Sequence, residues 1–92
     1  MSRHQTSNLS GADLEGADLR GADLKEVDFS GANLKGTNFG RDMRGGSTQL
    51  QGTNLSGEQI QGASFDGAEY DDQTIFPESF DPVKHRMVFR IV

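Results

Sequence analysis

The stretch Ala12-Asp13-Leu14-Glu15-Gly16-Ala17-Asp18-Leu19-Arg20-Gly21 decides the fold, because it contains one five-residue pattern twice. Each copy has a small residue, an acidic residue, a leucine, a variable residue and a glycine. A large apolar residue recurs at this spacing along most of the chain, at Leu9, Leu14, Leu19, Leu24, Phe29, Leu34 and Phe39, and again at Leu50, Leu55, Ile60, Phe65 and Tyr70. Such internal periodicity is typical of a repeat architecture.

A period of five fits neither an α-helix nor a flat strand. On a helix, successive large residues would lie ~140° apart rather than in a stripe. On a flat strand they would alternate between the two sides. The chain must therefore turn once per repeat, with the small and the large residue facing inward and the glycine at the corner. The sequence predicts an all-β solenoid with a single central core.

Segments such as Ala12-Asp13-Leu14-Glu15-Gly16 resemble the pentapeptide-repeat family, whose pattern is A(D/N)LXX. This resemblance implies a right-handed quadrilateral β-helix with four repeats per coil. It also implies a C-terminal segment through which the chain leaves the coil. For this sequence we expect about three coils followed by a non-repeat C-terminal cap and a tail.

The repeat is interrupted between Phe39 and Leu50, whose spacing exceeds two repeats by a single position. We interpret Arg41-Asp42-Met43-Arg44-Gly45 as a degenerate repeat that places Met43 in the core. The organisation predicted is a lead at 1–6, a β-helix at 7–71 with a register break near 40–48, a cap at 72–82 and a tail at 83–92. The predicted structural core has 13 members: Leu9, Leu14, Leu19, Leu24, Phe29, Leu34, Phe39, Met43, Leu50, Leu55, Ile60, Phe65 and Tyr70.

The C-terminal residues suggest a cap and an oligomerisation strand. Ile75, Phe76 and Phe80 are expected to lie over the open last coil. The tail at 83–92 is basic, and its apolar residues alternate as in a strand. It could pack back on the domain, pair with another chain or be disordered. The most specific of these hypotheses is a homodimer through the tail, with its predicted interaction residues at Met87, Phe89 and Ile91.

The sequence offers little for catalysis or metal binding. There are no cysteines, and neither His4 nor His85 has a carboxylate at a recognisable spacing. Acidic residues five positions apart are scattered around a coil and cannot form one calcium-binding loop. We expect no enzymatic activity, no catalytic residue, no metal and no cofactor. Glu58 and Arg41 occupy small inward positions, and we expect the local backbone to turn both outward.

Charge and hydropathy limit the classes of partner. The formal net charge is −5, from 14 acids and 9 Lys+Arg, which argues against direct nucleic-acid binding. No apolar run approaches the ~18–20 residues of a membrane span, and no secretory segment is recognisable, so we expect a cytoplasmic protein. The predicted function is a non-enzymatic protein-interaction or assembly scaffold with an unknown protein partner.

The family resemblance implies an alternative function, a DNA mimic that inhibits or modulates a DNA-binding enzyme such as gyrase. A mimic must present closely spaced negative charge, because duplex DNA carries about two charges per 3.4 Å. Assigning every fourth repeat to one face leaves no face with an unbroken column of acids, since Lys and Arg residues are mixed among them. The charge therefore favours the scaffold over the mimic.

Overall fold

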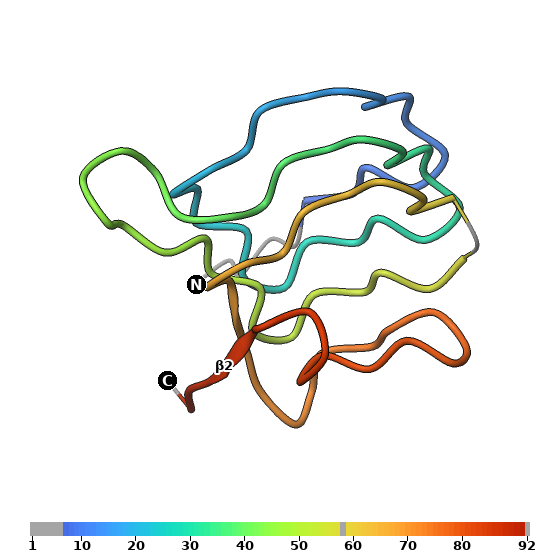
Figure 1. Cartoon of the computed structure of the whole chain (residues 1–92). Coiled ribbons are helices and arrows are strands. Elements are labelled where there is room, and N and C mark those ends of the chain that lie inside the picture. Colours follow the sequence, from blue (N-terminus) through green and yellow to red (C-terminus); the bar gives the residue numbers. More distant parts are fainter. Residues whose placement is uncertain (1–6, 58, 92) are drawn as a thin grey trace, which may run out of the picture.

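The backbone of the computed structural model winds into stacked coils, and the model describes residues 7–57 and 59–91 (Figure 1). The predictions for His4 and Glu58 lie outside the described residues. Parallel bridges join Asn8 to Asp28, Asp13 to Asn33 and Asp18 to Asn38, and the two members of each pair are four repeats apart. One coil therefore contains four five-residue repeats, and the stack has four faces.

Each face is a ladder of backbone hydrogen bonds between successive coils. We number the faces by the residues that stack on them. Face 1 contains Asn8, Asp28, Asn54 and Ile75; face 2 contains Asp13, Asn33 and Gln59; face 3 contains Asp18, Asn38 and Ser64; face 4 contains Asp23, Gln49, Glu69 and Val88. Two bonds join each step: on face 1 the Leu9 N–H donates to the Asp28 carbonyl (2.7 Å) and the Asp28 N–H donates to the Ser7 carbonyl (2.9 Å).

Regular strands are short, because the chain turns a corner about once per repeat. They are β1 (Glu69–Tyr70) and β2 (Val88–Phe89), which pair in parallel with Glu69 opposite Val88 and Tyr70 opposite Phe89. The corner of coil 1 before face 4 is Gly21, whose φ of +74° favours glycine. Glu26 occupies the next corner with a φ of +66°, a conformation that costs a residue with a Cβ about 1–2 kcal/mol.

The core lies along the axis of the stack and is densest in the second and third coils. The large residues that are fully buried there are Phe29, Leu34, Phe39, Leu50, Leu55 and Phe65. Rings continue along the axis, since Phe39 stacks on Phe65 with centroids 5.0 Å apart. Threonines also occupy the small inward position, and their hydroxyls donate to carbonyls of the coil below, as Thr37 does to Leu14 (2.9 Å) and Thr53 to Leu24 (2.8 Å). These bonds explain why a buried polar residue is tolerated there.

The predicted core position of Met43 is wrong, because its side chain is 90% exposed. The bridges across this region join residues that are six positions further apart than those joined in the first coil. Examples are the bridges from Asp23 to Gln49 and from Asn38 to Ser64. Six residues are thus inserted in the second coil, and 41–46 form a loop that projects from the side of the stack, green in Figure 1. The Asp42 N–H donates to the Gly46 carbonyl (2.8 Å), which closes the loop and lets the coil resume.

The ladder continues beyond the predicted end of the β-helix at residue 71. Ile75 bridges to Asn54 and takes the outward position of face 1, so its side chain is 50% exposed and its predicted capping role is wrong. Phe76 and Phe80 do pack against the core, and the Phe80 ring lies 5.2 Å from the Phe65 ring of face 3. The loop 77–86 thus covers the part of the stack where the last coil is missing.

After this loop the chain returns to face 4, and β2 forms its last step. The tail therefore packs back on its own domain, the first of the three alternatives that the sequence leaves open. The Val88 N–H donates to the Ala68 carbonyl (2.8 Å) and the Arg90 N–H donates to the Tyr70 carbonyl (2.8 Å). Only one edge of β2 is used in these bonds.

Candidate interaction surface

The structure separates the three predicted interaction residues of the tail. Met87 is buried, so its predicted role as an exposed contact is wrong. It directly precedes β2 and therefore takes the inward position of the small residues, above Ala68. Phe89 and Ile91 are exposed, and the Phe89 ring keeps an edge-to-face contact with Tyr70 at 5.4 Å.

A buried polar cluster holds the tail in place. The Glu69 carboxylate, 8% exposed as a residue, lies 3.3 Å (Oε2) from the Arg90 Nε. The Gln51 amide donates from Nε2 to Glu69 Oε1 (3.0 Å) and to the Arg90 carbonyl (3.1 Å). Three segments that are far apart in the sequence thus meet at one buried carboxylate, and we call Gln51, Glu69 and Arg90 the tail latch.

His85 contacts aromatic rings rather than a carboxylate. Its ring stacks on Phe80 with centroids 4.2 Å apart and meets Phe65 edge-on at 5.9 Å. A hollow of about 350 Å³ opens beside it, between Ile60 and the loop that carries Glu78. The packing explains why a histidine occurs here, as part of the cover over the end of the core.

The loop 41–46 has a fixed backbone. Asp42 Oδ1 accepts hydrogen bonds from the N–H groups of Arg44 (2.9 Å) and Gly46 (2.6 Å). The other carboxylate oxygen is so close to Gly46 and Gly21 that a Cβ at either glycine would lie within 2.7 Å of it. The loop therefore rests on the Gly21 corner of the first coil.

Thr48 fastens the base of this loop. Its Oγ1 accepts a hydrogen bond from the Gly21 N–H (2.8 Å) and lies 2.9 Å from the Gly40 carbonyl, to which it donates. The buried Thr48 hydroxyl, two positions after the loop, thus joins the first coil to Gly40, the residue before the loop. These hydrogen bonds attach both ends of the loop to the first coil.

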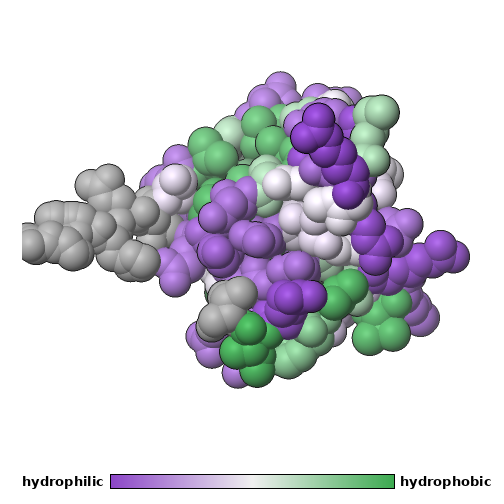
Figure 2. Space-filling model, turned by 90° about the vertical axis from the view of Figure 1, so that its left-hand side faces the viewer, coloured by the Kyte–Doolittle hydropathy of each residue, from purple (hydrophilic) through white to green (hydrophobic). Residues whose placement is uncertain are grey.

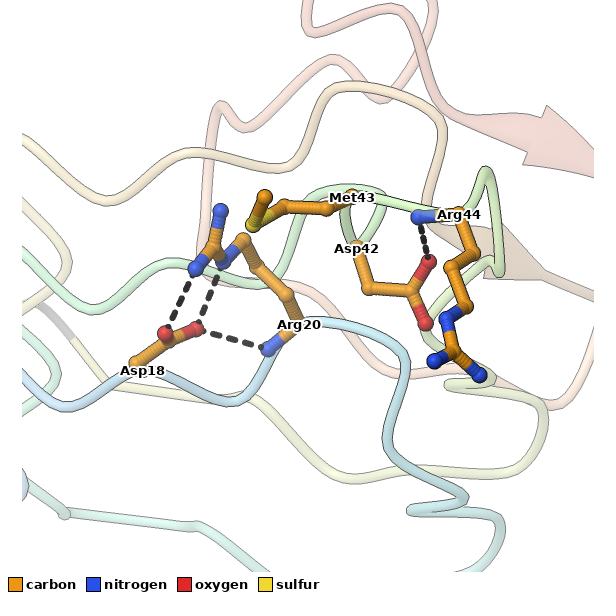
Figure 3. A pocket seen from close by; sticks show the side chains of 5 residues that line it. All are labelled: Asp18, Arg20, Asp42, Met43 and Arg44. Carbon is orange, nitrogen blue, oxygen red and sulfur yellow. Dashed lines mark hydrogen bonds and ion pairs between the residues drawn. The ribbon is translucent and has the colours of Figure 1, made fainter.

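A hollow of about 440 Å³ separates the loop from face 3, lined by Asp18, Arg20, Asp42, Met43 and Arg44 (Figure 3). Arg20 donates to both oxygens of Asp18, from Nε and Nη2 at 2.8 Å each. This pairing lowers the pKa of Asp18 and raises the pKa of Arg20. In Figure 3 the Met43 side chain extends toward Arg20, whereas the Arg44 side chain points the other way.

Arg41 begins the loop and lies across the next corner of the stack. A Cβ at Gly67 would be 2.6 Å from the Arg41 Cζ and Nε. Arg41 is exposed, as expected for a charged residue that the local backbone turns outward. Figure 2 shows this side of the molecule, where hydrophilic residues cover much of the middle and hydrophobic residues lie toward both the upper and the lower margins.

The carboxylates beside the loop already have partners within the chain. Within 7–57 and 59–91, no group of three or more His, Cys, Asp or Glu residues could hold a metal ion. In the hollow the Asp18 carboxylate is taken up by Arg20, and one Asp42 oxygen is taken up by backbone N–H groups. The same part of the chain contains no helix with the length and hydrophobicity that crossing a membrane requires.

The sequence predicted a register break near 40–48 but not that 41–46 form a projecting loop, and it did not predict the tail latch. The loop had a signal, since the irregular spacing between Phe39 and Leu50 and the pair Gly45-Gly46 mark an irregular turn. The latch had none, because Gln51 and Arg90 are far apart in the sequence and neither interrupts a repeat.

Comparison with known proteins agrees with the coil. The family model for pentapeptide repeats matches residues 7–41 with eight copies. The solved crystal structure of a pentapeptide repeat protein from Nostoc Pcc 7120 is 33% identical in sequence and covers 92% of this chain and 78% of its own. The chain belongs to the pentapeptide-repeat family.

Pentapeptide-repeat proteins fold as right-handed β-helices and are generally non-enzymatic structural or interaction proteins. The TM-score between this pentapeptide-repeat protein and the Nostoc structure is 0.39. No curated protein matches the sequence.

Proposed function

We propose that this pentapeptide-repeat protein is a non-enzymatic interaction scaffold and that its partner docks on the side that carries loop 41–46. The observation that supports this most strongly is Met43, which is 90% exposed on a loop whose backbone donates two hydrogen bonds to the Asp42 carboxylate. Burying this large apolar side chain would be favourable in free energy, yet the fold leaves it exposed to solvent. Methionine and arginine are enriched in protein–protein interfaces.

The surroundings of Met43 suit a protein partner. The hollow beside it offers a paired Asp18–Arg20 and the neighbouring Arg44, which can hydrogen-bond to polar groups of a partner at the rim of an apolar contact. The fold does not need the loop, because the steps from Asp13 to Asn33 and from Gln49 to Glu69 each close with four repeats. The loop is therefore free to serve binding.

The test compares variants of the loop with a variant of another face. A partner recovered by affinity capture from the source cell is purified, and its affinity is measured by calorimetry. We expect Met43→Ala and Arg44→Ala to weaken binding by roughly tenfold or more each. Lys35→Ala, an exposed residue of face 2, should leave it unchanged. Equal affinities for all four proteins would overturn the proposal.

The alternative function, a DNA mimic, predicts that the protein inhibits gyrase. Arg20 and Arg44 lie in the hollow with Asp18 and Asp42, and Lys25 lies 3.7 Å from Asp23, so positive groups break up the acids on these sides. A mimic depends on continuous negative charge. We expect gyrase supercoiling to be unaffected by a large excess of the protein, and strong inhibition would favour the mimic instead.

A further inference from the structure

Both ends of the stack expose apolar side chains, but different segments of the chain form them. At the N-terminal end Leu9 is 38% exposed and Leu14, Leu19 and Leu24 are only partly buried, whereas their counterparts in the second coil are fully buried. At the other end Phe89 is 53% exposed above Tyr70, and loop 77–86 covers the core near Phe65 and Ile60 instead. At both ends of the stack, apolar side chains from the core columns are thus exposed because no further coil covers them.

The backbone at both ends also has free hydrogen-bonding groups. In each bridged pair, the upper residue uses its own N–H and C=O. The residue below it contributes the C=O of its preceding neighbour and the N–H of its following neighbour. By this pattern the N–H and C=O of Asn8 and Asp23 point out of the first coil. At the other end the free groups are the Phe89 N–H and Met87 C=O on face 4 and the Phe76 N–H and Thr74 C=O on face 1. None of these groups has a backbone partner among the described residues.

These two sets of groups are complementary. Faces 4 and 1 are adjacent, and each has four stacked residues, the last of which are Val88 and Ile75. A second copy placed on top in the same orientation would set its Asp23 over Val88 and its Asn8 over Ile75. Its Asp23 C=O would accept from the Phe89 N–H, and its Asp23 N–H would donate to the Met87 C=O, as in each inner step.

The same placement continues the core. On face 4 the apolar column runs from Leu24 through Leu50 and Tyr70 to Phe89, so the next copy's Leu24 would cover the exposed Phe89 ring. On face 1 its Leu9 would lie above Phe76. Unpaired strand edges with apolar side chains readily pair with another chain.

Charge favours this contact over a contact between two tails. The first coil, residues 7–26, has five acids and two bases, a net charge of −3, whereas residues 83–91 have three bases and no acid. With the covering loop included, residues 77–91 have three bases and the two acids Glu78 and Asp81, a net charge of +1. Two tails would bring Lys84, Arg86 and Arg90 of both copies together. A tail and a first coil attract each other.

We propose that copies of this protein associate head to tail. The first coil of one copy then lies on the C-terminal end of its neighbour, over β2 on face 4 and over Ile75 on face 1. Such a contact is heterologous and does not close on itself, so it adds copies one by one. It does not involve loop 41–46 and is independent of the proposed function.

Sedimentation velocity tests the proposal by mixing variants that each block one end. Leu9→Lys blocks the N-terminal end, Phe89→Lys blocks the C-terminal end, and Met43→Lys is the control on the side. We expect the wild type and the control to grow beyond a dimer from the 10.0 kDa monomer as concentration rises toward about 1 mM, less so in high salt. Each end variant alone should remain a monomer, and their equimolar mixture should stop at a dimer.

Other outcomes overturn the proposal. A wild-type mass that stays at 10.0 kDa excludes association. Dimers of Leu9→Lys alone indicate a tail-to-tail contact, and dimers of Phe89→Lys alone indicate a contact between two first coils. Circular dichroism verifies that each variant is folded. If one is not, Asp23→Lys and Ile91→Lys replace them, because both side chains are exposed, and the same mixture result is required.

Discussion

Arg90 Nε lies 3.3 Å from Glu69 Oε2, and this ion pair joins the last step of face 4 to the coil below it. Glu69 is buried whereas the Arg90 side chain is 62% exposed. The pair is therefore asymmetric: the arginine is largely hydrated, and the carboxylate depends on Arg90 and Gln51 for its partners. Removing the arginine leaves a buried carboxylate that has lost a charged partner.

We expect Arg90→Ala to lower the free energy of unfolding by about 1–2 kcal/mol, because a buried carboxylate without its cation bears most of its desolvation cost. Lys84→Ala, which removes an exposed base of the same tail, should change stability by less than about 0.5 kcal/mol. Urea unfolding followed by circular dichroism measures both. Equal effects of the two substitutions would show that the latch does not hold the tail.

Two corner glycines of the first coil should differ in their response to alanine. Gly16 and Gly21 have nearly the same φ, +72° and +74°, but only Gly21 faces the Asp42 carboxylate, 2.6 Å from the position of a Cβ. We expect Gly16→Ala to cost about 1–2 kcal/mol from the backbone alone. Gly21→Ala should cost about 1 kcal/mol more, because the loop must shift. Urea unfolding of both variants checks this, and identical losses would mean that the loop does not rest on this corner.

Asp42 is predicted to keep the loop ordered. In Asp42→Ala the N–H groups of Arg44 and Gly46 lose their acceptor, which weakens the loop by about 1 kcal/mol. Limited trypsin digestion should then cleave after Arg44 roughly fivefold faster than in the wild type. Asp66→Ala, at an exposed corner, is the matched control. Unchanged cleavage in Asp42→Ala would show that the loop owes its order to other contacts.

Two surface aspartates should titrate below the ordinary value. Hydrogen bonds from Arg20 lower the pKa of Asp18 from 3.8, and hydrogen bonds from Ser30 lower the pKa of Asp28 from the same value. A lowered folded-state pKa contributes stability that is present above 3.8 and is lost as the pH falls through the folded-state pKa. Carboxyl-carbon NMR titration of the wild type and of Arg20→Gln measures this. Arg20→Gln should raise the pKa of Asp18 and leave that of Asp28 unchanged, and a response of both aspartates would point to a change in the fold.

The sequence predicted the coil well, because each repeat carries its own information. A leucine two positions after a small residue and two before a glycine can bury itself only if the chain turns, and this requirement recurs in every repeat. The error at Met43 has the same origin: Asp42-Met43-Arg44-Gly45 resembles a repeat locally, and no neighbouring residue shows that the Asp42 carboxylate caps a loop instead.

The C-terminal region was less predictable, because its contacts join distant segments. Ile75 was expected to cover the core, yet register with Asn54 places it on the outward side of a step. The cis pairing of the tail depends on Glu69 and Gln51, and polar side chains of this kind are mostly found on the surface. The proposed interaction surface beside loop 41–46 likewise arises from the inserted length rather than from a motif.

Deleting residues 41–46 tests the central claim, that the loop is an insertion for binding in an otherwise continuous β-helix. The deletion returns the spacing between Asp23 and its partner Gln49 on face 4 to four repeats, as in the first coil. We predict that the variant keeps its circular dichroism spectrum and its free energy of unfolding within about 1 kcal/mol. In calorimetry it should no longer bind the partner that the wild type binds. A folded deletion variant with undiminished affinity, or a variant that cannot fold, would contradict the account.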